Sequence, residues 1–163
     1  MIIASKDFRD EELLEPKEIL EKNNIKVVIA SSSLSEARGM LGARVKPDVL
    51  IDNVDTKEFD AIIFAGGSGS SEYWDSPIAH KILREAEASG KIIGSICIAP
   101  VTLANAGILK GKRATCWSSE GSKLKAKGAI YTGKDLEIDG NIITCSGPSA
   151  AREFGEAILK KLK

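Results

Sequence analysis

The stretch that decides the fold runs Lys91-Ile92-Ile93-Gly94-Ser95-Ile96-Cys97-Ile98-Ala99-Pro100. Its apolar run, 92–96, predicts a strand that is buried on both faces. Cys97 ends this strand, and apolar residues at helical spacing predict a helix over 98–105. The thiol then lies at a strand-to-helix turn, where the first helical N–H groups have no intrahelical partner. We expect this position to lower the pKa of the thiol, whereas the alternative is a small cysteine buried in a core strand.

The length and charge of the chain limit its class. Its 163 residues suit a single domain, 1–163, with one hydrophobic core. Lys plus Arg and Asp plus Glu number 23 each, so the net charge is zero and argues against nucleic acid or an anionic membrane as partner. The sequence contains no apolar run long enough to span a bilayer and no recognisable signal peptide, so we expect a cytoplasmic protein.

The cysteine and histidine content argues against a metal site. Cys97, Cys116 and Cys145 lie far apart without a C-x-x-C pair, and His80 is the single histidine. The P-loop and dinucleotide glycine motifs are both absent, so we expect neither a metal nor another cofactor. Cys116 and Cys145 are interpreted as inert core thiols, and His80 as a surface residue of a helix.

Strands and helices alternate through the first two thirds of the chain, which predicts a parallel sheet with helices on both faces. The expected strands are 1–4, 25–30, 60–65, 91–96 and 113–117, with a small β-hairpin excursion at 43–51 and a second hairpin at 136–144. The expected helices are 11–23, 77–89, 98–105, 118–127 and 150–162. Pro16 is tolerated best near a helix start, which would place Glu12 at or just before the first turn.

Three features follow neighbouring strands of this sheet, at the carboxyl ends where ligands of such sheets bind. Glu12 follows the first strand, Gly66-Gly67 the third and Cys97 the fourth. If Glu12 lies under Cys97, burial should keep it partly protonated and able to exchange a proton with the thiol; a favourable partner of the helix dipole is the alternative. The amide of one of these glycines and that of Ile98 could form an oxyanion hole, although a flexible turn explains the glycines equally well.

Three further residues are candidates to line a pocket at this edge. Gly66 and Glu72 belong to the loop after the third strand, and Trp117 ends the strand at 113–117. A solvated loop is the alternative interpretation for Glu72, and a core position is the alternative for Trp117.

Several motifs in this order carry a resemblance to a known family. They are Glu11-Glu12 followed by Pro16, Phe64-Ala65-Gly66-Gly67, the stretch 94–100, the stretch 106–115, Gly147-Pro148 and Glu153-Phe154. Together they resemble the ThiJ/PfpI superfamily over nearly the whole chain. The resemblance implies a flavodoxin-like three-layer sandwich with a mostly parallel central sheet, usually as a homodimer or larger homo-oligomer. It also implies that Cys97 is the nucleophile, Glu12 its carboxylic partner, and the Gly67 and Ile98 amides the oxyanion hole.

The sequence departs from the family at two places. Protease-like members carry a histidine directly after the cysteine, where this chain has Ile98, and other members supply one from the strand that here ends at Trp117. Neither route gives a cysteine–histidine pair, so proteolysis is the activity most weakened, because amine leaving groups need a general acid. The first strand is also short, since in the family a few more residues usually precede the position of Ile2.

These observations leave several functional hypotheses. The first is a glyoxalase III or deglycase-type enzyme that uses Cys97 and Glu12 on small reactive carbonyl compounds. The alternative is a non-catalytic redox sensor or stress-related, chaperone-like protein, because a reactive thiol beside a carboxyl group is readily oxidised. An intracellular cysteine peptidase is less well supported, and a family member whose cysteine has lost its role is a further possibility.

Overall fold

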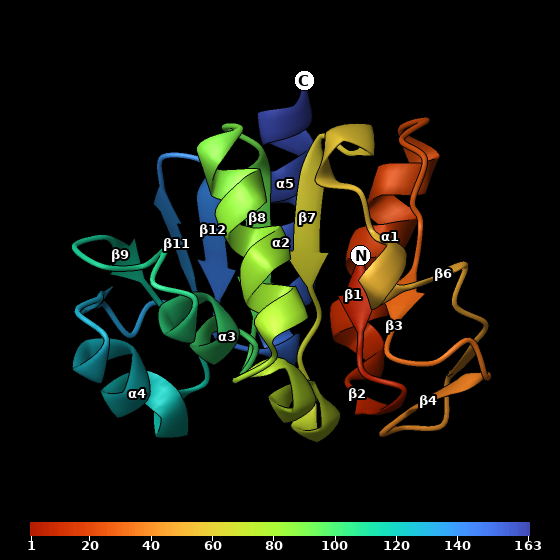
Figure 1. Cartoon of the computed structure of the whole chain (residues 1–163), viewed down its shortest axis with the longest axis horizontal. Coiled ribbons are helices and arrows are strands. Elements are labelled where there is room, and N and C mark those ends of the chain that lie inside the picture. The colour runs from red at the N-terminus through yellow and green to blue at the C-terminus, as the bar shows by residue number, and fades with distance from the viewer.

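The computed structural model describes residues 1–163 and shows a seven-stranded central sheet with helices on both faces (Figure 1). The strand order is β11-β12-β8-β7-β1-β3-β6, and all neighbouring pairs are parallel except the β11–β12 pair at one edge. The strands are β1 Ile2–Ile3, β3 Ala30–Ser31, β6 Val49–Leu50, β7 Ala61–Phe64, β8 Ile92–Ile96, β11 Leu136–Asp139 and β12 Ile142–Cys145. The predicted three-layer α/β sandwich is confirmed.

The helices lie in two layers. Helices α1 and α5 pack together behind the sheet of Figure 1, and α2 and α3 lie on the opposite face. Their bounds are α1 Asp10–Lys22, α2 Pro77–Ala88, α3 Pro100–Asn105, α4 Gly121–Ala126 and α5 Ala151–Leu162. No helix is both long and apolar enough to cross a membrane.

Short elements complete the chain. A three-stranded sheet contains β2 Lys6–Phe8, β4 Ala37–Gly39 and β5 Arg44–Val45, and a two-stranded one contains β9 Arg113–Ala114 and β10 Ile130–Tyr131. The 3-10 turns are η1 Ile51–Asn53, η2 Thr56–Glu58, η3 Ser68–Tyr73, η4 Ser118–Glu120 and η5 Pro148–Ala150.

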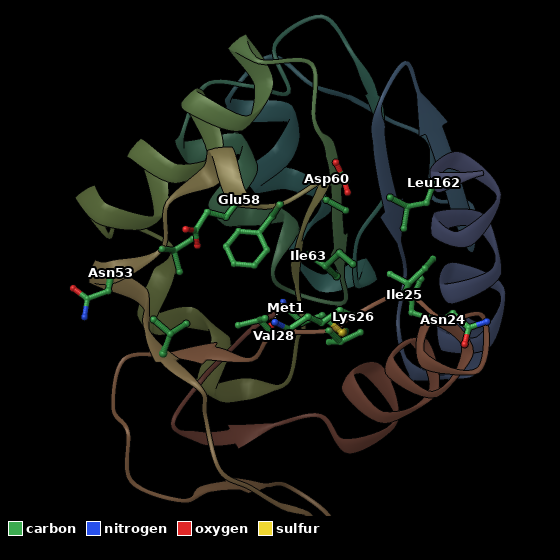
Figure 2. Close-up of a pocket in the computed structure, with 16 residues that line it drawn as sticks. Met1, Asn24, Ile25, Lys26, Val28, Asn53, Glu58, Asp60, Ile63 and Leu162 are labelled. Atoms are coloured by element: carbon green, nitrogen blue, oxygen red, sulfur yellow. Dashed lines mark hydrogen bonds between the residues drawn. The ribbon is translucent and has the colours of Figure 1, made fainter.

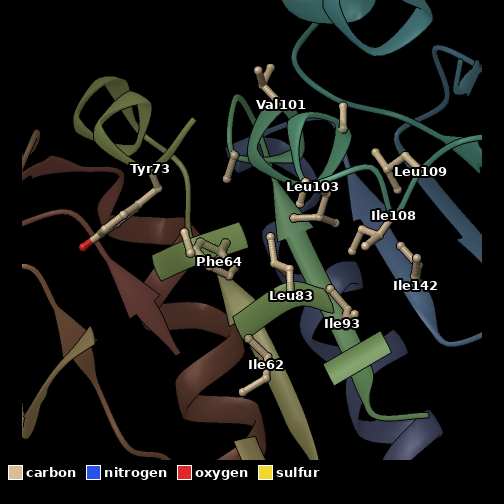
Figure 3. Close-up of a cluster of buried hydrophobic side chains, with 14 of the residues drawn as sticks. Ile62, Phe64, Tyr73, Leu83, Ile93, Val101, Leu103, Ile108, Leu109 and Ile142 are labelled. Carbon is tan, nitrogen blue, oxygen red and sulfur yellow. The ribbon is translucent and has the colours of Figure 1, made fainter. Parts of the chain in front are cut away.

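Strand β8 lies at the centre of the core because all five of its residues are buried. On the α2 face, Ile93 belongs to a large cluster with Phe64, Leu83 and Leu103 (Figure 3). On the other face, α5 approaches closely at Gly94, where a Cβ would lie only 3.0 Å from the Phe154 ring. Both faces of the strand that carries Cys97 are therefore held by close packing, which fixes the position of the turn that follows.

The hairpin predicted at 43–51 and the strand predicted at 25–30 differ from what the structure shows. The expected hairpin at 43–51 does not form: Arg44–Val45 pairs antiparallel with Ala37–Gly39, and Val49–Leu50 joins the main sheet beside Ala30–Ser31. The Asp10 carboxylate favours the observed hairpin, because it accepts hydrogen bonds from the tip amides of Leu41 and Ala43 at 2.9 and 2.7 Å. The expected strand at 25–30 is reduced to its end, since β1 begins only at Ile2 and the earlier residues receive a single bond on this side, from the Met1 nitrogen to the Val28 carbonyl at 2.7 Å.

Helix boundaries also differ from the predictions. The helix after Cys97 begins at Pro100, so a turn of three residues separates it from β8. Pro16 lies inside α1 rather than near its start, where its missing N–H leaves the Glu12 carbonyl without its i+4 partner. Close packing accompanies this break, since a Cβ on Gly155 of α5 would lie 2.8 Å from the Pro16 Cα. The strand predicted at 113–117 extends only over Arg113–Ala114.

Candidate active site

Cys97 occupies a strained turn directly after β8. Its φ is +65°, in the left-handed region that non-glycine residues seldom adopt. Two backbone hydrogen bonds hold it there: its N–H donates to Cys145 at 2.9 Å, and its carbonyl accepts from Trp117 at 2.7 Å. The side chain is half-buried. This is the geometry of a nucleophile elbow, which presents a side chain at the carboxyl edge of a sheet.

Glu12 lies beside this thiol, in the first turn of α1, and is fully buried. Neither carboxyl oxygen has a partner in good hydrogen-bond geometry, although the Cys97 thiol and the Gly66 N–H lie close enough to favour its charged form. Burial outweighs both and raises the pKa of Glu12 to about 7. The expectation of a partly protonated carboxyl group agrees with this value.

Gly66 and Gly67 let the backbone approach the pair. A Cβ on Gly66 would lie 2.3 Å from Glu12 Oε2 and 2.5 Å from the Cys97 Cβ, so no side chain fits between the two groups. Gly67 has a φ of +95°, and a Cβ there would lie 2.3 Å from the Arg9 amide nitrogen. Both positions therefore require glycine for reasons of space or conformation.

The pKa of Cys97 contradicts the sequence-based expectation. Burial and the neighbouring Glu12 charge raise the pKa of the thiol to about 12, whereas we expected the turn to lower it. The expected effect exists, because the N–H groups of Gly67 and Ile98 lie near enough to the sulfur to lower the pKa of the thiol. The lowering of the pKa by the two amides is smaller than the increase caused by desolvation of the thiolate and by repulsion from the Glu12 carboxylate.

Cys97 and Glu12 therefore act as one titrating unit. Two negative charges in this buried space repel each other, so the pair holds one proton over the range between the two pKa values, about 7 and about 12. When that proton lies on Glu12, the Gly67 and Ile98 amides stabilise the thiolate. The site can thus form a nucleophile and an acid by moving a single proton.

Arg9 is a neighbour of the pair that the sequence reasoning missed. Its backbone N–H donates to the Gly66 carbonyl at 2.9 Å, which ties the start of α1 to the glycine loop. Its guanidinium binds Glu11 through two hydrogen bonds of 2.8 and 3.0 Å, and its charge lowers the pKa of Glu12. A basic residue three positions before a predicted buried glutamate was the available signal.

Trp74 was also missed, and it joins the glycine loop to the elbow. Its indole N–H donates to the Ile98 carbonyl at 3.1 Å. Its own carbonyl is contacted by Asn105 Nδ2 at 3.0 Å and by His80 Nε2 at 2.8 Å. His80 therefore bonds to the loop backbone. No sequence pattern indicated that hydrogen bonds join this loop to the helix after Cys97.

The predicted pocket residues have different positions. Trp117 is 46% exposed, borders the elbow through its backbone, and lays its ring against Gly147, where a Cβ would lie 2.8 Å from the ring. Glu72 is exposed and accepts a 3.0 Å hydrogen bond from Ser32 Oγ. Ser32 directly follows β3, so the Glu72 carboxylate is bound there rather than to the thiol.

The other two thiols lie in the core. Cys116 and Cys145 are buried, at 1% and 0% exposure, and burial raises the pKa of each to about 12. Of the three cysteines, only Cys97 is open to solvent in part.

Comparisons with known proteins identify the family of the chain. The model of the DJ-1/PfpI family matches residues 1–161. A glutathione-independent glyoxalase of Caenorhabditis elegans is 31% identical over the full chain and 87% of its own length, and a deglycase of Pyrococcus horikoshii is 28% identical over the full chain and 98% of its length. The crystal structure of a ThiJ/PfpI domain protein from Brachyspira murdochii superposes with a TM-score of 0.96 at 32% identity, over 99% of this chain and 93% of that one. The chain belongs to the DJ-1/PfpI family.

Proposed function

We propose that this protein is a cysteine-dependent enzyme of the glyoxalase type, which converts small 2-oxoaldehydes to 2-hydroxy acids without glutathione. One observation carries the proposal: a half-buried thiol lies beside a buried carboxyl group of pKa about 7, with the Gly67 and Ile98 amides near enough to the sulfur to favour the thiolate. A carboxyl group with a pKa near neutrality both accepts and donates a proton at physiological pH. The glyoxalase and deglycase relatives support the same general type of chemistry.

The first step is addition of the thiol to the aldehyde. The Cys97 proton passes to the Glu12 carboxylate as Sγ bonds to the aldehyde carbon, and the carbonyl electron pair moves to its oxygen. The Gly67 and Ile98 N–H groups stabilise that oxygen, which then takes the proton back from Glu12. The product is a hemithioacetal, and Glu12 is again a carboxylate.

The second step moves a proton along the substrate. Glu12 removes the proton from the carbon bound to sulfur, and the electron pair forms an enediolate with the neighbouring carbonyl group. Glu12 then returns the proton to the neighbouring carbon, while the hydroxyl proton of the first carbon moves to the oxygen of the second. This converts the hemithioacetal into the thioester of a 2-hydroxy acid. Water then cleaves the thioester and restores the thiol, so the net reaction adds one water molecule and needs no oxidant or reductant.

The decisive test is lactate production from methylglyoxal by the wild type, Cys97→Ser and Glu12→Gln. Only the wild type should exceed the background rate, because the serine variant lacks the nucleophile and the glutamine variant cannot move the proton. Cys116→Ser serves as the matched control and should keep full activity, since its thiol is buried and is not among the groups that shift the pKa of Cys97. Equal rates in the wild type and Cys97→Ser would refute the proposal.

A deglycase activity is distinguished by the substrate. With preformed adducts of methylglyoxal on an amine, a true deglycase releases the amine faster than the adduct dissociates by itself. If the release rate instead equals spontaneous dissociation while lactate appears, the protein acts on the free aldehyde.

A redox-sensing role is the second candidate, because Cys97 is the one cysteine that solvent reaches. A sulfinate at this position would accept hydrogen bonds from the Gly67 and Ile98 amides and from protonated Glu12. Mass spectrometry after mild peroxide treatment should then find two added oxygens on Cys97 and none on Cys116 or Cys145. Oxidation spread equally over the three cysteines would contradict this role.

We also propose that the chain forms a homo-oligomer through the surface around the start of α1. Leu14 is 43% exposed one turn after Asp10, and Asp10 binds the hairpin tip where Met40 and Leu41 are 44% and 63% exposed. Exposed apolar side chains on two elements that Asp10 joins favour an interface. Sedimentation equilibrium should give a dimer or larger for the wild type, and Leu14→Arg should shift it toward the monomer; a wild-type monomer would contradict the proposal.

A further inference from the structure

Arg9 lies where the glycine loop meets helix α1. It is the residue directly before α1, and its N–H donates to the Gly66 carbonyl at 2.9 Å. A Cβ on Gly67 would lie 2.3 Å from the Arg9 nitrogen, so the two backbones are in direct contact. The Arg9 side chain therefore starts beside the loop whose Gly67 amide favours the Cys97 thiolate.

One edge of the Arg9 guanidinium is occupied, and the other is free. Nε and Nη2 donate to the two Glu11 carboxylate oxygens at 2.8 and 3.0 Å. A guanidinium has five N–H groups in a planar fork, so two on Nη1 and one on Nη2 remain. These groups have no partner within the chain, and 29% of the Arg9 side chain is exposed. The free edge, formed by Nη1 and Nη2, fits a second carboxylate with two parallel hydrogen bonds.

The Glu11 carboxylate holds this free edge in place. The pair is bidentate, and Arg9 lowers the pKa of Glu11, so Glu11 stays ionised and bound at neutral pH. A side chain that is already ordered loses little conformational entropy when it binds a ligand. The pair thus presents a fixed donor edge rather than a flexible arginine.

The charge of Arg9 acts on both groups of the catalytic pair. It lowers the pKa of Glu12, and the Cys97 thiolate in turn raises the pKa of Arg9. An anionic ligand bound at the thiol would have the same kind of attraction to the guanidinium. His80, the one histidine of the chain, bonds instead to the Trp74 carbonyl. Arg9 is therefore the basic side chain that the site offers to an anion.

The pocket shown in Figure 2 does not provide an alternative carboxylate site. Its volume is about 600 Å³, and it lies where β7 begins, whereas Cys97 follows the end of the parallel strand β8. Its charged lining residues are Lys26, Glu58 and Asp60, two acidic groups against one basic group. An anion is therefore disfavoured in this pocket.

We propose that Arg9 binds a carboxylate of the substrate, and that the site prefers 2-oxoaldehydes that carry such a group on a short alkyl chain. This inference rests on the proposed glyoxalase function and names the substrate class of the same site. The carboxylate accepts two hydrogen bonds from the Nη1–Nη2 edge while Cys97 adds to the aldehyde carbon. It takes no part in the bond changes, so the reaction still adds one water molecule and yields a 2-hydroxy dicarboxylic acid.

Two five-carbon substrates that differ only at the far end test this preference. In 4,5-dioxopentanoate that end is a carboxylate, and in 2-oxopentanal it is a methyl group. For the wild type, kcat/KM should be roughly tenfold to 100-fold higher for the carboxylate substrate, the range expected for charge-assisted hydrogen bonds. In Arg9→Gln this ratio should fall to about one, chiefly through a higher KM for 4,5-dioxopentanoate. Any effect of Arg9→Gln on Glu12 is common to both substrates, so the ratio reports on the carboxylate alone.

Lys17→Gln is the matched control, because it removes the same charge from an ion pair with Glu21 further along α1. This variant should keep the wild-type ratio. Three results would overturn the proposal: a wild-type ratio near one, an equal ratio in the wild type and Arg9→Gln, or an equal fall of the ratio in Lys17→Gln and Arg9→Gln.

A measurement without turnover separates this proposal from the glyoxalase function. If the wild type converts neither substrate, the glyoxalase function fails, and glutarate still tests the carboxylate site. Glutarate should slow the alkylation of Cys97 by iodoacetamide in the wild type and in Lys17→Gln, but not in Arg9→Gln. The same alkylation rate with and without glutarate in the wild type would overturn the carboxylate site itself.

Discussion

The indole N–H of Trp74 donates a 3.1 Å hydrogen bond to the carbonyl oxygen of Ile98. Asn105, in the helix after the elbow, returns a 3.0 Å bond to the Trp74 carbonyl. The loop that carries the Gly67 amide and the turn that carries the Ile98 amide are thus joined by two bonds in opposite directions. The spacing of these amides determines how well they stabilise charge beside Cys97.

Trp74→Phe should lower kcat on methylglyoxal by roughly threefold to tenfold with little change in KM, because it loosens the Ile98 turn and leaves the substrate contacts in place. The free energy of unfolding should fall by only about 1 kcal/mol, the usual net value of one hydrogen bond. Trp117→Phe is the matched control, since the bond from Trp117 to Cys97 comes from the backbone. Equal kcat values for both variants would show that the Trp74 bond does not position the turn.

Glu12→Gln should change how stability depends on pH. In the folded state the pKa of Glu12 rises from 4.5 to about 7, so the folded protein binds this proton more tightly than the unfolded chain does. The resulting stabilisation is complete below pH 4.5 and is lost as the pH rises to about 7, a difference of roughly 3 kcal/mol. As the pH rises between these values, the wild type loses this stabilisation and the variant does not, so the stability of the variant should increase relative to that of the wild type.

Urea unfolding at pH 4.5, 6 and 8 measures this difference. Glu11→Gln provides the control, because Arg9 lowers the pKa of the neighbouring Glu11 and the sign of its pH effect is reversed. If the difference between wild type and Glu12→Gln were constant over this range, the pKa of Glu12 would be the same in the folded and unfolded states.

Alkylation by iodoacetamide should modify Cys97 alone in the native protein, since Cys116 and Cys145 are buried. The wild-type rate should still be rising above pH 9, because burial and Glu12 raise the pKa of the thiol to about 12. In Glu12→Gln the carboxylate charge is gone, so the rate at pH 8 should rise by about tenfold, the effect of a drop of roughly one pKa unit. A wild-type rate that levels off near pH 6 would mean that the two amides outweigh burial. Cys97→Ser, treated in parallel, should remain unlabelled.

Gly66→Ala should abolish lactate production. The added methyl group would lie 2.3 Å from Glu12 Oε2 and 2.5 Å from the Cys97 Cβ, so the two groups must separate. We expect a loss of at least 100-fold in kcat/KM with a destabilisation of about 1–3 kcal/mol, typical of overpacking. Gly107→Ala is the control, because its Cβ meets no atom within 4 Å and only its positive φ is disfavoured. Full activity in Gly66→Ala would mean that Glu12 need not touch the thiol.

The sequence predicted the layers of the fold and the place of the site because both follow from local patterns. The buried run 92–96 and the periodic helices define the sheet and its covering, and the order Glu12, Gly66-Gly67, Cys97 follows from parallel strands that end at one edge. The partner of each short strand was not predictable, since Val49–Leu50 pairs across the sheet with residues almost twenty positions earlier.

The electrostatics of the site depended on distances that no pattern contains. A thiol at a helix start is expected to be acidic, yet the elbow buries Cys97 beside a carboxyl group, and this reverses the direction of its pKa shift. Trp74 escaped notice for a related reason: its role depends on the approach of Ile98 and Asn105, which lie more than twenty residues away in the chain.

Both tryptophans of the chain contact the elbow, and this gives the protein an intrinsic optical reporter. Trp74 bonds to Ile98 through its indole, and Trp117 bonds to Cys97 through its backbone. The chain has two tryptophans in total, so its long-wavelength fluorescence arises only from residues that are hydrogen-bonded to the elbow. Binding, oxidation or alkylation of Cys97 can thus be followed in real time by emission from unlabelled protein.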